Sequence, residues 1–139
     1  MRAISLWQPW ATAIAVGVKR VETRHWPTNH TGPLAIHAAK HWTISERRYT
    51  ATARELWSLG GIPLSFGAIV ATCTLMGCRR TEDVELQLSE IERFYGNYAP
   101  GRFAWFLTDI VALSEPIPFK GHQGFFNVPD ELLNGPATG

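Results

Sequence analysis

A short charged segment near the start of the chain contains residue types suited to binding a base or a phosphate. The segment Gly17-Val18-Lys19-Arg20-Val21-Glu22-Thr23-Arg24 holds a lysine, a glutamate and an arginine in close succession. Together these side chains could present a donor, an acceptor and a planar guanidinium fork to a ligand. The segment is therefore the first candidate for a functional site.

The spacing of these three residues leaves two interpretations open. In a fully extended segment Glu22 and Arg24 share one face, and Lys19 lies on the other. All three converge if the strand begins at Val21, after a bend at the exit of the preceding helix. The alternative is a surface salt-bridge cluster, which contributes little to stability.

Tryptophans flank the charged segment, and the chain has six of them in 139 residues. A base stacked on an aromatic side chain gains about 1–3 kcal/mol. Trp7 and Trp26 lie beside a turn and a charged run, so they are candidates for stacking, with core packing as the open alternative. Trp10, Trp57 and Trp105 lie in apolar, periodic settings and are predicted to fill the core.

His37 and His41 are four residues apart, a spacing that binds zinc when both lie on one helix. Here His37 falls in a predicted strand, and no nearby carboxylate completes a set of ligands. We therefore expect no cofactor, without excluding a divalent metal. His37 is interpreted either as a donor facing a cleft or as a core histidine with a backbone partner.

The surrounding patterns predict the elements that position these residues. Residues 2–6 alternate weakly as a short strand, and Pro9 suits the first turn of a helix that ends at Gly17. Residues 18–26 are predicted to be extended. A turn at Gly32 then leads into a buried strand over 34–38.

The second part of the chain mixes helices and strands in an irregular order. Thr43 and Glu46 match a capping box and predict a helix that ends at Gly60 and Gly61. We then expect a central strand over 67–74 and an acidic helix over 82–94. A last strand or strand pair over 103–107 and 110–113 and an aromatic loop over 117–126 follow. This order favours an α/β fold built on a small mixed barrel over a doubly wound sheet.

Length and charge distribution limit the class of protein. A chain of 139 residues has room for one core, so 1–139 is predicted to be a single domain with a peripheral tail beyond about residue 128. The net charge of +1 argues against tight nonspecific binding of nucleic acid. Residues 1–54, however, hold eight lysines and arginines against two acids, which indicates one basic face.

The two cysteines and the apolar runs indicate a cytoplasmic protein. Cys73 and Cys78 are an odd number of residues apart, so a strand would point them to opposite faces and a disulfide is not expected. No apolar run approaches the roughly 20 residues needed to cross a bilayer. The first residues lack the long apolar core of a signal peptide.

The charged segment also resembles a known signature. Gly17-x-Lys19-x-x-Glu22-x-Arg24 is similar to the GxKxxExR signature of ASCH domains, and it follows the first predicted helix as in that family. Trp7-Gln8-Pro9-Trp10 resembles the aromatic turn of bacterial and phage members. The stretches 32–40 and 103–107 are similar to later strands of the family, so the resemblance covers the chain from Ile4 to about Val128.

This resemblance implies a PUA-like mixed β-barrel with flanking helices and a cleft beside the first helix that binds RNA or a modified nucleoside. The expected partner is therefore RNA or a nucleoside, with no membrane and no evident protein partner. The residues expected to bind it are Trp7, Gln8, Lys19, Glu22, Arg24, Trp26, His37 and Lys40.

Two other functions remain open. Some ASCH relatives are amidohydrolases that remove an acyl group from cytidine with a lysine and a threonine of this signature, and others resemble ribonucleases. Lys19 matches that lysine, whereas Glu22 stands at the position of the threonine. Lys19 and Glu22 are thus candidate catalytic residues. In a ribonuclease Lys19 could stabilise the developing charge, and Glu22 or His37 could move protons. A coactivator-style interaction domain is the third function, although no exposed amphipathic helix is evident.

Overall fold

The computed structural model describes residues 1–59 and 63–134. Its strands are β1 (Arg2–Leu6), β2 (Val21–Arg24), β3 (Gly32–Ala38), β4 (Ala68–Arg80), β5 (Phe103–Pro118) and β6 (Phe126–Asn127). Its helices are α1 (Trp10–Ala15), α2 (Ile44–Thr52), α3 (Arg54–Ser58), α4 (Thr81–Val84), the 3-10 helix η1 (Glu85–Gln87), α5 (Glu90–Phe94) and α6 (Asp130–Leu133).

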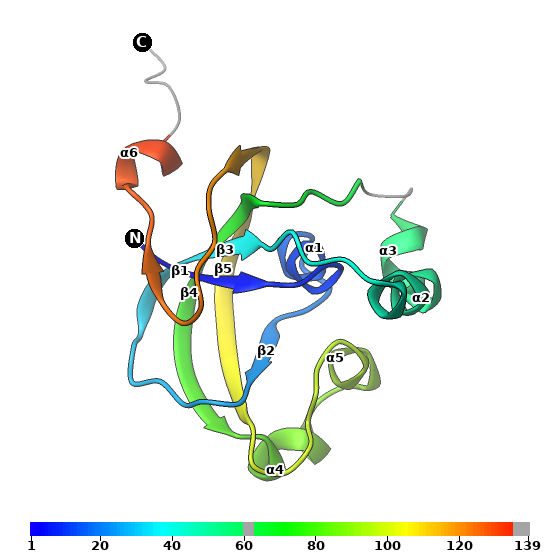
Figure 1. Ribbon diagram of the computed structural model, residues 1–139. Coiled ribbons are helices and arrows are strands. Elements are labelled where there is room, and N and C mark those ends of the chain that lie inside the picture. The colour runs from blue at the N-terminus through cyan, green and yellow to red at the C-terminus, as the bar shows by residue number, and fades with distance from the viewer. Residues whose placement is uncertain (60–62, 135–139) are drawn as a thin grey trace.

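The strands form one six-stranded sheet in the order β2-β5-β4-β3-β1-β6. β1 and β3 run parallel, and the other neighbouring pairs are antiparallel. Figure 1 shows β4 and β5 side by side as two long curved strands. Their register shifts at three places, and such irregularities let paired strands bend and twist strongly. The fold is therefore a mixed α/β arrangement around a strongly curved sheet.

The predicted closed barrel is not confirmed. Within residues 1–59 and 63–134, β2 pairs only with β5, and β1 pairs only with β3 and β6. The sheet therefore has a seam between β1 and β2 that no backbone ladder closes. One side chain crosses it, since Arg24 of β2 donates from Nη1 to the carbonyl oxygen of Ser5 in β1 over 3.3 Å.

The main core lies between α1 and the strands. Ala11 and Ile14 of α1 join Ile4, Leu34 and Trp105 in one buried cluster. Small side chains on this short helix let it approach the sheet closely. The chain then turns at Gly17, whose φ of +83° is a conformation that glycine adopts without strain. This turn sets the bend that precedes β2.

The predicted helix after Thr43 is present but interrupted. Thr43 and Glu46 form the expected capping box, with Thr43 accepting from Ser45 N and Glu46 accepting from Thr43 N. The helix breaks at Ala53, which separates α2 from α3. The predicted end at Gly60 and Gly61 lies outside the described residues.

The acidic helix predicted over 82–94 is wrong as a single element. It is divided into α4, η1 and α5, because Leu88 is extended and Ser89 caps a new helix by accepting from Glu92 N. The last strand is longer than predicted. β5 continues through Asp109, where φ is +51°, and ends at Pro118. It therefore includes the first two residues of the aromatic loop predicted over 117–126.

The tryptophans divide between core and surface. Trp105 is fully buried, as predicted, and Trp10 is partly buried against the same core. The prediction for Trp57 is wrong, because 58% of this residue is exposed. Its indole Nε1 instead donates to the carbonyl oxygen of Thr50 on the helix surface.

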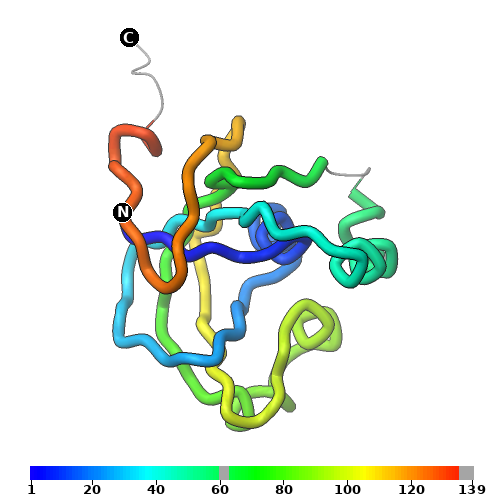
Figure 2. The backbone as a smooth tube through the Cα atoms, in the orientation of Figure 1, coloured from blue at the N-terminus to red at the C-terminus, as the bar shows by residue number. Residues whose placement is uncertain are grey.

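Both ends of the described chain meet at one side of the sheet. The N-terminal ammonium of Met1 donates to Val128 O and to Asp130 Oδ1, each over 2.8 Å. Figure 2 shows the start of the tube beside the segment that leads to α6. Cys73 and Cys78 are free thiols, as expected. None of the helices in the described part of the chain is long and apolar enough to span a bilayer.

We predict that Trp105→Ala lowers the free energy of unfolding by about 3–5 kcal/mol, because truncation leaves a large cavity in the main core. Trp57→Ala is the matched control and should change it by less than about 1 kcal/mol, since that side chain is exposed. Urea denaturation followed by circular dichroism measures both values. Equal losses in the two variants would contradict the placement of Trp105.

Candidate functional site

A cleft of about 1610 Å³ lies along the seam between β1 and β2. The ends of β1 and β3, the strand β2, the C-terminal end of α5 and residues 118–124 contribute to its walls. Its charged lining residues are Glu22, Arg24, Lys40, Arg102 and Lys120. Four of these five are basic, so the cleft attracts anions.

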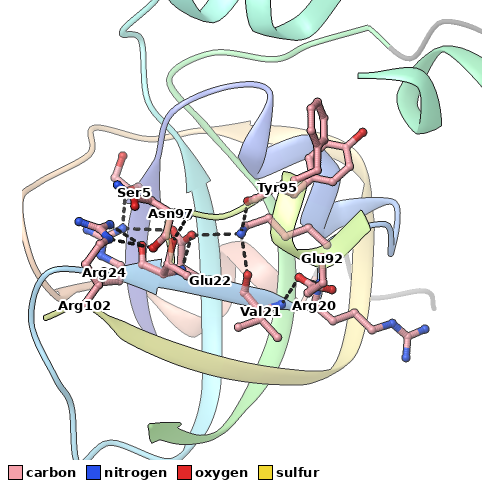
Figure 3. A network of polar contacts seen from close by, with 12 residues as sticks. Ser5, Arg20, Val21, Glu22, Arg24, Glu92, Tyr95, Asn97 and Arg102 are labelled. Atoms are coloured by element: carbon pink, nitrogen blue, oxygen red, sulfur yellow. Dashed lines mark hydrogen bonds and ion pairs between the residues drawn. The ribbon is translucent and has the colours of Figure 1, made fainter. Parts of the chain in front are cut away.

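The three residues of the charged signature form one connected network, shown in Figure 3. The Lys19 amine lies 3.5 Å from Glu22 Oε1, and Arg24 Nη1 lies 3.4 Å from Glu22 Oε2. β2 begins at Val21, which is the condition under which we expected the three side chains to converge. The network is not a surface cluster, because Lys19 and Glu22 are buried.

Lys19 is enclosed by acceptors from two parts of the chain. Its amine is 0% exposed and donates to Val21 O over 2.6 Å and to Tyr95 O over 2.5 Å. With Glu22, these oxygens match the three donors of an ammonium group. Burial lowers the pKa of Lys19, whereas the carboxylates of Glu22 and Glu92 act in the opposite direction.

Glu92 of α5 secures the start of β2. Its carboxylate accepts from the backbone N–H groups of Arg20 and Val21 over 2.8–3.1 Å. Because Tyr95 of the same segment accepts from Lys19, α5 contacts the signature both through its backbone and through an acidic side chain. The orientation of the signature therefore depends on a helix about 70 residues away in sequence.

Glu22 and Arg24 are the members of the signature that line the cleft. Glu22 also accepts from Thr23 N over 3.0 Å, so its carboxylate is held from several directions. Each carboxylate oxygen has two lone pairs, which leaves acceptor capacity for a ligand N–H. The pair thus offers an acceptor beside a guanidinium donor, held in one place.

Aromatic side chains form further parts of the wall. Trp7 is 51% exposed and stacks on His41 with ring centroids 3.8 Å apart. His41 in turn contacts Glu46 Oε1 over 2.6 Å. Burial alone would raise the pKa of Glu46, but hydrogen bonds from Thr43 and the proximity of His41 outweigh it and lower that pKa. One face of Trp7 is thereby supported while the residue stays largely accessible.

Trp26 lies at another part of the cleft wall. The guanidinium carbon of Arg24 lies 5.5 Å from the centroid of the Trp26 ring. Trp26 also meets Trp105 and Phe125 edge to face, at 4.7 and 5.3 Å. The main core therefore supports Trp26 and, through it, the position of Arg24.

The structure brings most of the predicted site residues to the cleft, but not all. Those that line it are Trp7, Glu22, Arg24, Trp26, His37 and Lys40. Lys19 and Gln8 lie behind the walls. Gln8 is fully buried, where its Oε1 accepts from Thr12 N over 2.9 Å and its Nε2 donates to Ser65 O over 2.8 Å.

The two interpretations of His37 both describe its surroundings. It is buried with a backbone partner, since Nε2 lies 2.7 Å from Phe119 O, and it also lines the cleft. His37 and His41 have different partners, Ser5 with Phe119 for the first and Glu46 for the second. The pair of histidines therefore does not converge on one point.

Sequence reasoning missed several lining residues. Asn97, Arg102 and Lys120 come from the half of the chain that is acidic overall, so charge patterning gave no signal for them. Arg102 donates to Thr23 O over 3.2 Å and so packs directly against the signature. Ser5 was missed because its partner is set by the register of β1 on β3.

Comparison with known proteins shows the family to which this chain belongs. A profile of the ASCH domain matches residues 4–117, which include the signature, His37, His41 and most of β5. The chain belongs to the ASCH domain family. The resemblance seen in the signature is therefore confirmed, and the mixed sheet with flanking helices has the PUA-like fold without the barrel closure.

Curated relatives of this ASCH domain are much longer. Over 138 residues it is 26% identical to Activating signal cointegrator 1 from Mus musculus and from Homo sapiens. Each match covers 98% of this chain and 24% of the relative, so the chain spans about a quarter of their length.

Solved structures support the fold of this ASCH domain. ASCH from Zymomonas mobilis superimposes with a TM-score of 0.59 at 19% identity, covering 96% of this chain and 90% of that chain. A tyrosine-to-phenylalanine mutant of that protein gives a TM-score of 0.58 at 18% identity, covering 96% and 93%.

We predict that Lys19→Met lowers the free energy of unfolding by about 3–5 kcal/mol, because it breaks a buried ion pair and leaves Glu22 with Arg24 as its remaining cation. It also leaves the carbonyl oxygens of Val21 and Tyr95 without the donor that they share. Arg20→Met is the matched control, since it removes a neighbouring exposed cation, and it should cost less than about 1 kcal/mol. Urea denaturation measures both. Similar small losses in the two variants would contradict a structural role for the Lys19 network.

We predict that His37 makes stability depend on pH. Burial lowers the pKa of His37, a neighbouring His122 lowers it further, and the hydrogen bond with Phe119 opposes both. The contribution of His37 to the free energy of unfolding is thus fully present above about pH 6.5. It is lost as the pH falls through the lowered pKa that His37 has in the folded protein. The stability difference between wild type and His37→Gln should therefore shrink with acidification.

Thermal unfolding of both proteins between about pH 8 and pH 5 measures this difference. His25→Gln, which removes an exposed imidazole from the same cleft, serves as the control for losing a histidine. A wild-type advantage over His37→Gln that stays constant over the whole range would show that the buried ring does not titrate as expected.

Proposed function

We propose that this ASCH domain binds RNA or a nucleoside by receiving a base in the cleft between β1 and β2. The observation that carries the proposal is the Glu22–Arg24 pair, fixed in a basic cleft that the exposed Trp7 and the partly buried Trp26 also line. The pair can contact polar atoms on a base edge, and the tryptophans offer faces on which a base can stack.

The charge of the cleft supports an anionic ligand. Arg24, Lys40, Arg102 and Lys120 line it and can neutralise phosphates. Glu22 is the acidic residue among the five charged residues that line the cleft, and its carboxylate would repel a nearby phosphate. A carboxylate in this position is useful if it accepts from the N–H groups of a base, because phosphates have no such donors.

The size of the cleft favours a nucleotide within a strand over a free nucleoside. Pockets for small molecules have volumes of about 300–1,000 Å³. At about 1610 Å³ this cleft is larger, so a base with its flanking phosphates has room. Splayed bases of single-stranded RNA are the form in which stacking and base-edge contacts are both available.

Lys19 enters this proposal as a positioning residue. Its amine is enclosed by protein acceptors, so in this arrangement it acts on a ligand through Glu22. The same enclosure makes binding the better-supported function and hydrolysis through Lys19 the weaker one. A catalytic lysine has to reach the reacting atoms, or exchange a proton with a group that does.

We predict that Trp7→Ala weakens binding of a short single-stranded RNA by about 1–3 kcal/mol, the contribution of one stacked base. Trp57→Ala is the matched control, since it removes an exposed tryptophan that does not line the cleft, and it should leave affinity unchanged. Fluorescence anisotropy with labelled RNA measures both. Identical affinities for wild type and Trp7→Ala would remove Trp7 from the site.

A second assay separates binding from hydrolysis. Short RNA and an acylated cytidine are incubated with wild type, Lys19→Arg and Glu22→Gln, with and without a chelator, and product formation is measured. The expected result is that wild type binds and shows no turnover that depends on Lys19 or Glu22. Turnover that both substitutions abolish would make hydrolysis the function and binding only its first step.

A further inference from the structure

Ser5 and His37 form a second polar pair in the cleft, separate from the charged signature. They are register partners on the parallel strands β1 and β3, and the Ser5 hydroxyl oxygen lies 2.8 Å from His37 Nδ1. Both residues line the cleft, and Ser5 is partly exposed. A serine in contact with a histidine in a cleft has the parts of a base-activated nucleophile.

The direction of the hydrogen bond follows from the second partner of the ring. His37 Nε2 lies 2.7 Å from the carbonyl oxygen of Phe119, which can only accept, so Nε2 carries the proton. Because burial lowers the pKa of His37, the ring is neutral near pH 7. Nδ1 is then an acceptor, and the Ser5 hydroxyl donates to it. This is the orientation in which a histidine removes a proton from serine.

The segment over the pair is shaped to fit it. A Cβ atom at Gly121 would lie 2.5 Å from His37 Cε1 and 3.1 Å from Ser5 Oγ. Only glycine therefore lets the backbone come this close while Phe119 O holds the ring. A backbone carbonyl takes the place that a carboxylate has in a Ser-His-Asp triad, where it fixes the tautomer of the histidine.

A cation lies next to the same serine. Arg24 Nη1 donates to the backbone carbonyl oxygen of Ser5 over 3.3 Å, so the guanidinium lies beside the residue that would attack. A fixed donor at this position can stabilise the oxyanion of a tetrahedral intermediate. The Ser5–His37 pair and the Arg24 guanidinium thus lie near one another at the seam between β1 and β2.

We propose that Ser5 and His37 are an acyl-transfer centre acting on an ester or amide carried by an anionic molecule. Ser5 Oγ bonds to the carbonyl carbon while its proton moves to His37 Nδ1. The intermediate then expels the amine or alcohol, which takes that proton from Nδ1. A water molecule then attacks the carbonyl carbon of the Ser5 ester and gives a proton to His37 Nδ1. The bond to Ser5 Oγ breaks, and Oγ takes that proton back, so that each cycle consumes one water.

A fluorophosphonate probe tests this directly, because it phosphonylates serines that are activated by a base. The expected result for wild type is one adduct on the peptide containing Ser5, found by mass spectrometry. Ser114, exposed on β5, is the internal control and should stay unmodified. Ser5→Ala should abolish labelling, and His37→Gln should slow it by about 100-fold or more.

Folded wild type without an adduct on Ser5 would overturn the proposal, whatever the stability of the variants. An adduct that forms equally fast in a folded His37→Gln protein would overturn it as well. The inference shares its cleft and Arg24 with the proposed function, but Ser5 and His37 carry it, and RNA binding is measured in parallel on the same samples. Labelling without RNA binding would refute the proposed function alone, whereas RNA binding without labelling would refute the acyl-transfer centre alone.

Discussion

Burial of the Lys19 amine imposes requirements on several elements at once. An ammonium group removed from water costs several kcal/mol unless acceptors surround it. Here the acceptors are a carbonyl of β2, a carbonyl after α5 and the carboxylate of Glu22. β2 therefore has to begin at Val21, and α5 has to pack against its start. Glu92 completes this junction by accepting from the backbone of β2.

The cleft follows the seam between β1 and β2, which are not paired with each other in the described part of the chain. A continuous ladder between the two strands would bury Ser5 O in a backbone hydrogen bond, whereas here the side chain of Arg24 reaches that oxygen across the seam. Side chains replace a backbone ladder along this line, so polar groups of both strands stay available to a ligand. The place where the barrel fails to close is thus also the place where chemistry is concentrated.

Sequence patterns predicted the turns, caps and shared strand faces that depend on neighbouring residues. The burial of individual side chains depends on contacts between distant parts of the chain, and the patterns predicted it only in part. The turn at Gly17, the capping box at Thr43 and the shared face of Glu22 and Arg24 all follow from short spacings. The burial of Lys19 does not, because Tyr95 is far away in sequence. Trp57 shows the same limit, since its neighbour Leu56 packs into the core while its own position on α3 faces solvent.

Arg24 connects the two sets of polar groups in the cleft. Its Nη1 contacts both Glu22 and Ser5 O, so a ligand phosphate that pairs with this guanidinium competes with bonds the protein already makes. The net gain from such a contact is the difference between the new bonds and the old ones. Glu22 keeps Lys19 and Thr23 N when Arg24 turns to a ligand, so its carboxylate is not left unpaired. The buried lysine thereby frees the arginine for ligands, because it satisfies the acid that would otherwise hold it.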